Sequence, residues 1–189
     1  MAYVVNYPLF NQNPQTLPIF DLNNATMDQD VPAFIKSLKH PLKFRMFLLS
    51  RLPNAFFAGL RIRDLDETSC RVTVPYKWFT KNPFRSTYFA CLSMAAEMST
   101  GALCLVHLHK RNPPVSMLVV KTEAEYFKKA VGKTSFICDD GLKIKECIEQ
   151  AVQTGEGKMI RARSVGKNSE GVAVAEFFIT WSFKVRGGR

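Results

Sequence analysis

The feature that most constrains this chain is a long apolar segment, residues 87–108, which contains a single acidic residue, Glu97. The segment is long enough to span a bilayer as a helix. A carboxylate in the middle of such a span costs several kcal/mol, and Ser93, Ser99 and His107 add further polar groups. We therefore interpret the segment as the buried central helix of a globular domain rather than as a transmembrane helix.

Glu97 is predicted to lie on a face of small side chains. At 100° per residue, four small residues fall within about 40° of it: Ala90, Ser93, Gly101 and Cys104. A poorly solvated carboxylate has a raised pKa, which suits a general base or a nucleophile. The alternative is a structural glutamate that pairs with an arginine or binds backbone amides.

The segments around this helix predict an α+β fold in which a curved antiparallel sheet wraps one long helix. A basic amphipathic helix is expected over 32–52, interrupted near Pro41. The central helix is expected to begin at Asn82, or with Ser86 or Thr87 as its cap. Extended segments are expected over 56–63, 70–74, 115–126, 133–139, 158–165 and 172–185, and a small helix over 142–153.

The domain organisation follows from composition. Residues 1–30 are rich in Asn, Gln and Pro and lack periodicity, so we expect a flexible arm whose removal leaves folding unchanged. Residues 31–189 are expected to form a single domain. The five cysteines contain no C-x-x-C pair, which favours buried thiols in a reducing compartment. No signal-peptide pattern is present at the N-terminus, and a cytoplasmic location is expected.

The charge of the chain predicts an anionic ligand. The formal net charge is +10, and residues 1–30 contain three aspartates and no Lys or Arg, which leaves +13 on the remainder. Such a surface attracts nucleic acid, anionic lipid or a phosphorylated molecule. No nucleic-acid-binding motif is present, so no nucleic-acid partner is expected, whereas a membrane surface is a possible partner of the 32–52 helix. His107 and His109 diverge on a helix, and no metal site is expected.

Two stretches of the sequence, 82–90 and 94–101, resemble the central-helix signature of hotdog-fold thioesterases. They are most similar to the phenylacetic-acid-type branch and to an uncharacterised branch of tetrameric acyl-CoA thioesterases. The order of elements from about 41 to 185 fits as well. The resemblance implies a hotdog fold, an acyl-CoA or other fatty-acyl ligand, and no cofactor other than the coenzyme A of the substrate. It also implies a homodimer or homotetramer with sites between protomers.

The same resemblance implies roles for individual residues. In such enzymes a loop before the helix, often His-Gly-Gly, binds the thioester carbonyl, and an acidic residue farther along attacks it or activates water. Glu97 matches the acidic residue. Asn82 matches a position at which relatives carry Asn, and its expected role is to orient substrate or water, with a simple helix cap as the alternative. The loop here has neither His nor Gly, although its backbone amides can still polarise a carbonyl. The candidate substrate-binding residues are Arg85, Ser86, Thr87, Ser93, Thr100 and Gly101.

These observations predict an acyl-CoA thioesterase-like hydrolase. The phosphates of coenzyme A are expected to bind along a basic rim drawn from Arg111, Lys128, Lys129, Arg161 and Arg163. For each of these residues a solvated surface charge is the alternative. The alternative function is a non-catalytic hotdog module that binds acyl-CoA or a fatty acid. The missing His-Gly-Gly favours that module, and the carboxylate in an apolar helix favours the enzyme.

Overall fold

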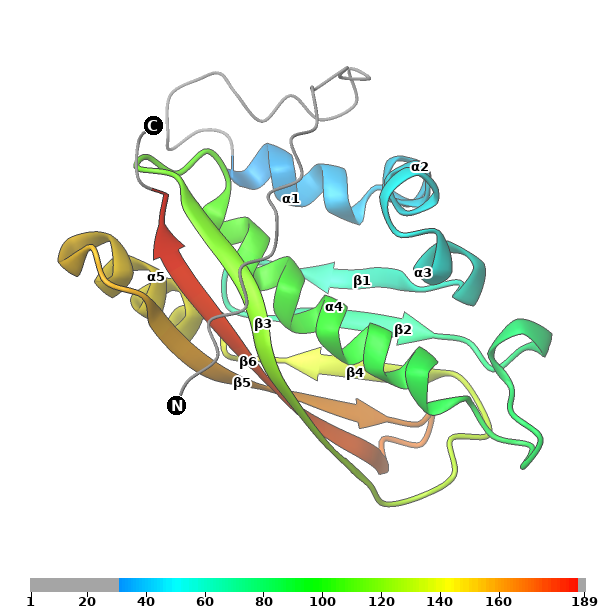
Figure 1. Ribbon diagram of the computed structural model, residues 1–189. Helices are drawn as coiled ribbons and strands as arrows, with labels where there is room; N and C mark the ends of the chain where they lie inside the picture. The colour runs from blue at the N-terminus through cyan, green and yellow to red at the C-terminus, as the bar shows by residue number, and fades with distance from the viewer. Residues whose placement is uncertain (1–30, 187–189) are drawn as a thin grey trace, which may run out of the picture.

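The computed structural model describes residues 31–186, which fold as a six-stranded sheet curved around one long helix (Figure 1). The sheet has the strand order β1-β2-β4-β5-β6-β3, and all neighbouring strands are antiparallel. The strands are β1 (Arg61–Leu65), β2 (Cys70–Val74), β3 (Val115–Tyr126), β4 (Thr134–Cys138), β5 (Lys158–Lys167) and β6 (Ala173–Val185). The helices are α1 (Val31–Lys39), α2 (Pro41–Arg51), α3 (Pro53–Ala58), the 3₁₀ helix η1 (Trp78–Thr80), α4 (Phe89–Leu108) and α5 (Gly141–Thr154).

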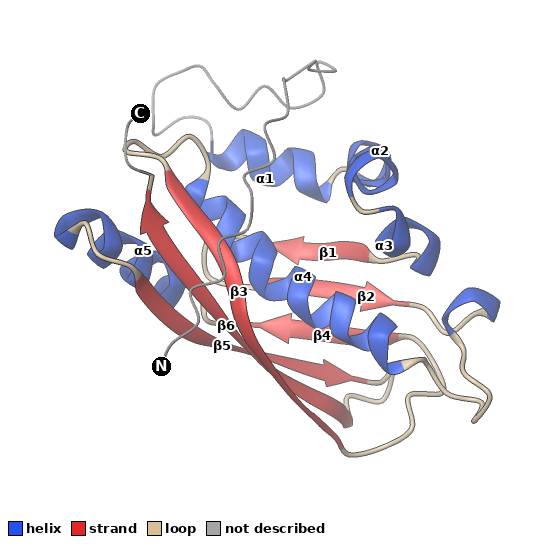
Figure 2. Ribbon diagram, viewed as in Figure 1, coloured by secondary structure: helices blue, strands red, loops and turns tan. Residues whose placement is uncertain are grey.

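This arrangement confirms the predicted α+β fold. The long helix α4 lies on the concave side of the sheet, and the helices and strands form separate layers (Figure 2). Alternate side chains of β6 are buried on the concave side of the sheet: Phe177, Ile179, Trp181 and Phe183 are all almost fully buried. Every second side chain of an antiparallel strand points to the same face. Trp181 Nε1 donates a 2.9 Å hydrogen bond to Thr100 Oγ1, which joins this face to α4.

Helix α4 is long and apolar enough to cross a membrane, but 67% of its most apolar stretch is buried within the fold. On the side of α4 opposite Glu97, the apolar residues Leu92, Ala95, Leu103 and Val106 are all buried. The interpretation of this segment as the central core helix is therefore confirmed.

Two helix boundaries differ from the prediction. Residues 56–58 belong to the short helix α3 and not to a strand. Pro53 suits the first turn of that helix, and Gly59 ends it with a left-handed backbone (φ 80°). Helix α4 begins at Phe89, later than the predicted starts at Asn82, Ser86 or Thr87, and its N-cap Tyr88 makes no side-chain capping bond. The Asn82 side chain instead accepts hydrogen bonds within the loop that precedes α4.

Helices α1 and α2 cover the side of α4 that the sheet leaves open (Figure 1). They break at His40, in agreement with the predicted interruption near Pro41. Their inward side chains Leu38, Phe44 and Leu48 are buried in the core. The predicted flexible arm, residues 1–30, lies outside the described residues.

Candidate functional site

Glu97 lines a small apolar cavity between α4 and the helices that cover it. The cavity has a volume of about 110 Å³. Its other lining residues come from α1, α2, the α2–α3 junction, β1, β3 and α4: Leu38, Phe44, Phe47, Leu52, Ile62, Met117, Met98, Gly101, Ala102 and Leu105. Among these described residues Glu97 is the one charged side chain, so the cavity presents a carboxylate to an apolar ligand.

The Glu97 carboxylate is held without a counter-charge. Within residues 31–186 it forms neither a hydrogen bond nor an ion pair, and burial raises the pKa of the Glu97 carboxyl above its usual range. Desolvation disfavours the charged form of an acid, which makes the ionised carboxylate a stronger base. The arginine or amide partner of the structural alternative is not found in this part of the chain. The described chain therefore provides the poorly solvated carboxylate that the sequence predicted.

The small face of α4 gives this carboxylate its room. A Cβ atom at Gly101 would lie 3.2 Å from Glu97 Oε1 and 3.3 Å from Trp181 Cζ2. Ser93 is partly buried on the same helix. Thr100 is fully buried, and its hydroxyl donates to the Glu97 carbonyl oxygen (2.9 Å) while it accepts from Trp181. The Thr100 hydroxyl therefore makes both of these hydrogen bonds to other groups of the protein, and it is not exposed to a substrate.

The loop before α4 is held together by Asn82. Its Oδ1 accepts hydrogen bonds from Phe84 N (3.0 Å), Ser86 N (3.1 Å) and Ser86 Oγ (3.2 Å). Asn82 therefore shapes the loop and does not cap the helix. Arg85, at the tip, is exposed and has a positive φ of 58°.

This loop forms one wall of a second, more open hollow of about 620 Å³. The other wall is the end of β3 with the segment that follows it, including Lys128 and Lys129. Thr87 joins the two walls, because its N and Oγ1 both donate to the Ala130 carbonyl oxygen (2.8 and 3.0 Å). The structure thus brings Asn82, Ser86 and Thr87 together with two of the predicted cations, at the N-terminus of α4.

The two hollows are separate within one protomer. Glu97 is eight residues after Phe89, the first residue of α4, and a helix rises about 1.5 Å per residue. The first amides of α4 therefore lie about 12 Å from Glu97 along the helix axis. That distance is too long for both to contact the same thioester carbonyl.

The five predicted phosphate-binding cations do not form one continuous rim. Arg161 pairs with Glu123 (2.9 Å) and lies over the Phe178 ring, and Arg163 pairs with Glu176. Both belong to β5. Arg111 follows the opposite end of α4, so only Lys128 and Lys129 line a hollow together with the loop.

No sequence pattern identifies the residues that close the cavity over Glu97. Leu38, Phe44, Ile62 and Met117 come from four different elements. Each is an ordinary apolar residue of an amphipathic segment, and no spacing in the sequence relates them. Within residues 31–186, no group of three or more His, Cys, Asp or Glu side chains is arranged to hold a metal ion.

Solved structures share this architecture. A Pseudomonas aeruginosa protein described as a probable thioesterase superposes with a TM-score of 0.67 at 19% identity, covering 79% of this chain and 99% of that chain. A Chlorobaculum tepidum protein of unknown function gives 0.65 at 18% identity, covering 80% and 99%. A Haemophilus influenzae thioesterase gives 0.56 at 12% identity, covering 78% and 93%. No curated protein matches the sequence.

The curved sheet and its carboxylate-bearing central helix define this chain as a hotdog-fold protein, with the fold found in thioesterase-family proteins. Within that class the chain belongs to the family described as "Domain of unknown function (DUF4442)", which matches residues 42–183. The match begins in α2 and ends near the end of β6. It therefore includes the sheet except for the last two residues of β6, and both hollows apart from the α1 residue Leu38.

Proposed function

We propose that this protein hydrolyses acyl-CoA thioesters and that Glu97 is the catalytic base or nucleophile. The observation that carries the proposal is the Glu97 carboxylate, unpaired within the described chain, in an apolar cavity on the central helix. A ligand with an apolar acyl chain matches the lining of that cavity. The carboxylate is then placed at the wall where a reacting carbonyl would enter.

As a base, Glu97 would take a proton from a water molecule while the water oxygen attacks the thioester carbonyl carbon. The tetrahedral intermediate then collapses, the carbon–sulfur bond breaks, and the coenzyme A sulfur takes the proton from Glu97 and leaves as the thiol, which regenerates the carboxylate. The apolar surroundings favour proton uptake by Glu97, because burial already raises its pKa. As a nucleophile, the same carboxylate would attack the thioester carbonyl carbon, the carbon–sulfur bond would break, and the thiolate of coenzyme A would leave. Water would then hydrolyse the acyl anhydride on Glu97 to the free acid and the regenerated carboxylate.

The distance between Glu97 and the first amides of α4 supports a homodimer as the active form. Within one protomer the carboxylate and the helix N-terminus are about 12 Å apart along the axis. Two protomers whose sheets pair edge to edge can bring the loop before α4 of one protomer beside Glu97 of the other. The edge strand β3 pairs only with β6 in the described chain, so its other side is available for such pairing. The proposal includes a homotetramer, in which two such dimers pair.

The hollow beside the loop is our candidate site for the phosphates of coenzyme A. Lys128 and Lys129 are exposed there, opposite Ser86 and Thr87. Arg161 and Arg163 are engaged by carboxylates, so they are weaker candidates. Exposed charge contacts are screened by salt, and affinity for coenzyme A should fall as ionic strength rises.

The alternative proposal is a non-catalytic module that binds acyl-CoA or a fatty acid. The loop favours it, because Asn82 Oδ1 is occupied by three donors from its own loop and no His or Gly is present. Such a module would bind the ligand in the same cavity but release no thiol.

The deciding experiment is release of free thiol from a panel of acyl-CoAs of increasing chain length. Glu97→Gln keeps the volume of the side chain and removes the base, so turnover should fall at least about a hundredfold, as expected for the loss of a general base. Glu170→Gln, an exposed carboxylate in the β5–β6 loop, is the matched control and should retain parent activity. Equal turnover by Glu97→Gln and the parent would refute the mechanism. Ligand binding without thiol release by the parent would favour the binding module.

A further inference from the structure

A second basic site lies at the end of the sheet where β1 begins and β2 ends. It is a hollow of about 520 Å³ between α2, the start of β1 and the segment after β2. Five cations line it: Arg45, Arg61, Arg63, Lys77 and Lys133. Its remaining lining residues are Gly59, Thr73 and Pro75, so none of the described lining residues is acidic. We call it the basic hollow.

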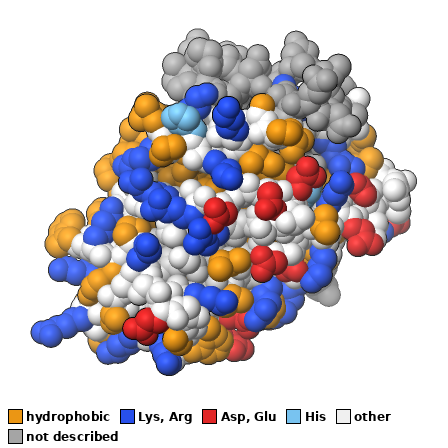
Figure 3. Space-filling model, turned by 180° about the vertical axis from the view of Figure 1, so that it is seen from behind, with side chains coloured by type: hydrophobic (Ala, Val, Ile, Leu, Met, Phe, Trp, Pro, Cys, Tyr) orange, Lys and Arg blue, Asp and Glu red, His pale blue; other side chains and the backbone are white. Residues whose placement is uncertain are grey.

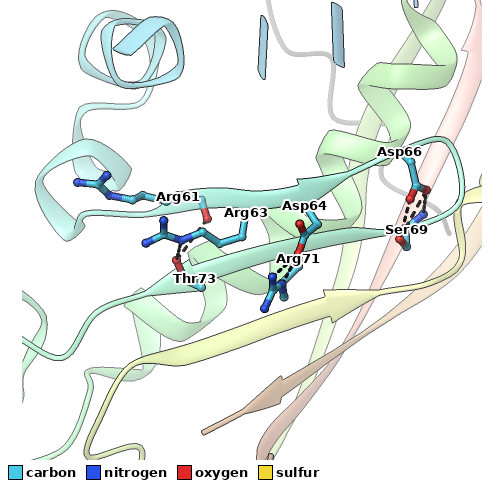
Figure 4. Close-up of polar contacts among 7 residues, drawn as sticks. All are labelled: Arg61, Arg63, Asp64, Asp66, Ser69, Arg71 and Thr73. Carbon is cyan, nitrogen blue, oxygen red and sulfur yellow. Dashed lines mark hydrogen bonds and ion pairs between the residues drawn. The ribbon is translucent and has the colours of Figure 1, made fainter. Parts of the chain in front are cut away.

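The cations of the basic hollow are positioned but not neutralised. Arg61 and Arg63 extend from β1 toward the same end of the strand, and Arg63 Nε donates to Thr73 Oγ1 (3.2 Å) (Figure 4). The neighbouring carboxylate, Asp64, is paired with Arg71 farther along. Within residues 31–186 none of the five cations forms an ion pair with a carboxylate. Lys and Arg side chains also gather on one side of the face seen in Figure 3. Such a cluster fits phosphate groups, which guanidinium groups bind in a bidentate manner.

An apolar stripe lies beside the basic hollow on α2. Leu42, Met46 and Leu49 are spaced four and three residues apart, so they share one face of the helix. Their side chains are exposed, Leu42 by 66%. The buried residues Phe44 and Leu48 lie on the opposite face, so this stripe points into solvent.

Exposed aromatic residues lie on the other side of the basic hollow. Phe57, in α3, is 5.9 Å from Phe79 between ring centroids, and Trp78 is 6.4 Å from Phe79. Trp78 is 80% exposed and directly follows Lys77 of the basic hollow. The elements α2, α3 and η1 follow one another along one side of the molecule (Figure 1). We call the apolar stripe, the aromatic residues and the basic hollow together the α2–η1 surface.

We propose that the α2–η1 surface docks the protein on an anionic lipid membrane. The basic hollow would bind lipid phosphates, and Leu42, Leu49 and Trp78 would enter the interface between headgroups and acyl chains. Tryptophan prefers that interface, and amphipathic basic helices bind it through an exposed apolar face. This inference uses none of the residues that line the Glu97 cavity and does not depend on the proposed thioesterase activity.

Charge complementarity favours a membrane over other occupants. A second copy of this chain, paired symmetrically on this surface, would bring five more cations against the first five. Nucleic acid would match the charge but would leave the aliphatic stripe exposed to water. A free phosphorylated molecule would fill the basic hollow without covering the stripe. An anionic bilayer matches both features.

The first test is sedimentation of the full chain with lipid vesicles. We expect binding to vesicles of phosphatidylcholine mixed with phosphatidylglycerol, weaker binding as salt rises, and much weaker binding to phosphatidylcholine alone. Arg61→Ala combined with Arg63→Ala should weaken binding about thirtyfold, which corresponds to about 1 kcal/mol for each arginine. The matched control, Arg161→Ala with Arg163→Ala, removes the same charge from β5 and should bind like the parent. Equal losses in both double variants, or no vesicle binding by the parent, would overturn the proposal.

The second test measures insertion. Of the two tryptophans, Trp78 is exposed and Trp181 is 3% exposed, so vesicles should shift the emission of Trp78 to shorter wavelength and protect it from an aqueous quencher. The shift should disappear in Trp78→Phe, in which Trp181 remains. Inorganic phosphate and free coenzyme A should cause no shift. A shift that persists in Trp78→Phe would contradict insertion of this residue.

The third test separates the apolar stripe from the charge. Leu42→Gln with Leu49→Gln should weaken vesicle binding about tenfold or more, because each removes exposed apolar area from the bilayer interface. Leu142→Gln with Met159→Gln, two similarly exposed residues on α5 and β5, is the control and should bind like the parent. If the Leu42 and Leu49 variant binds as well as this control while the Arg61 and Arg63 variant fails, the protein adsorbs to the vesicles through charge alone, and the insertion of the apolar stripe into the bilayer is overturned.

Discussion

Gly101 lies directly beside the carboxylate of Glu97, one helical turn away on α4, and a Cβ atom at Gly101 would lie 3.2 Å from Glu97 Oε1. The same Cβ atom would lie 3.3 Å from the Trp181 ring, so the carboxylate, the glycine and the indole are packed without spare room. The absence of a side chain at Gly101 therefore sets where the Glu97 carboxylate rests in its cavity.

Gly101→Ala should reduce thiol release more than it reduces stability. The added methyl group must displace the Glu97 carboxylate by a few tenths of an ångström, and displacement of a catalytic group is costly, so we expect kcat to fall about tenfold. Alanine favours a helix over glycine by about 1 kcal/mol, which offsets the local crowding. Initial rates and urea unfolding of the same preparation measure both effects. A variant with unchanged kcat would show that the position of the carboxylate is not critical.

Glu97→Gln should stabilise the protein at neutral and alkaline pH. Burial raises the pKa of Glu97 in the folded state above its unfolded value. The resulting stability is present below the unfolded pKa and is lost as pH rises through the folded pKa. Glutamine has no such loss, so the melting temperature of Glu97→Gln should exceed that of the parent at about pH 8. The difference should shrink toward about pH 4, where the parent carboxyl is mostly protonated in both states. A difference that is independent of pH would contradict the buried, unpaired carboxylate.

Trp181→Phe should destabilise the fold by about 2 kcal/mol, because it removes the hydrogen bond to Thr100 Oγ1 and leaves a small void in the core. Thr100→Val removes the same hydrogen bond from the other side. In a double-mutant cycle measured by urea unfolding, the two changes should be coupled by about 1 kcal/mol. Purely additive effects would indicate that the hydrogen bond contributes nothing to stability.

The edge strand β3 should mediate self-association. Leu118 and Val120 on this strand are 65% and 47% exposed. Leu118→Lys with Val120→Lys should weaken the expected homodimer about tenfold or more, since paired protomers would bring the new charges together. Light scattering over a range of concentrations measures this, with Leu142→Lys as a control on α5. A parent protein that is monomeric at micromolar concentration would contradict the homodimer itself.

Local patterns predicted most of the elements. The strands β2 and β3 begin and end at the predicted residues, because alternating apolar residues bounded by turns or prolines define a strand from the sequence alone. The start of α4 was misplaced because Asn82 carries a capping signal that the fold uses inside a loop. The helix α3 was missed because six residues are too few to show a helical period.

The sequence by itself determined that Glu97 would lie on a buried apolar helix, because one carboxylate in a long apolar run cannot be solvated on every side. Only the tertiary structure decided what surrounds it. The sheet curls so that β1 and β3, its two edges, bring Ile62 and Met117 to the same cavity, and α1 and α2 close over the gap. The tertiary structure also places Arg61 and Lys133, which are far apart in the chain, in the same basic hollow. Such contacts depend on sheet curvature and strand order, which arise from packing across the whole domain and leave no local pattern in the sequence.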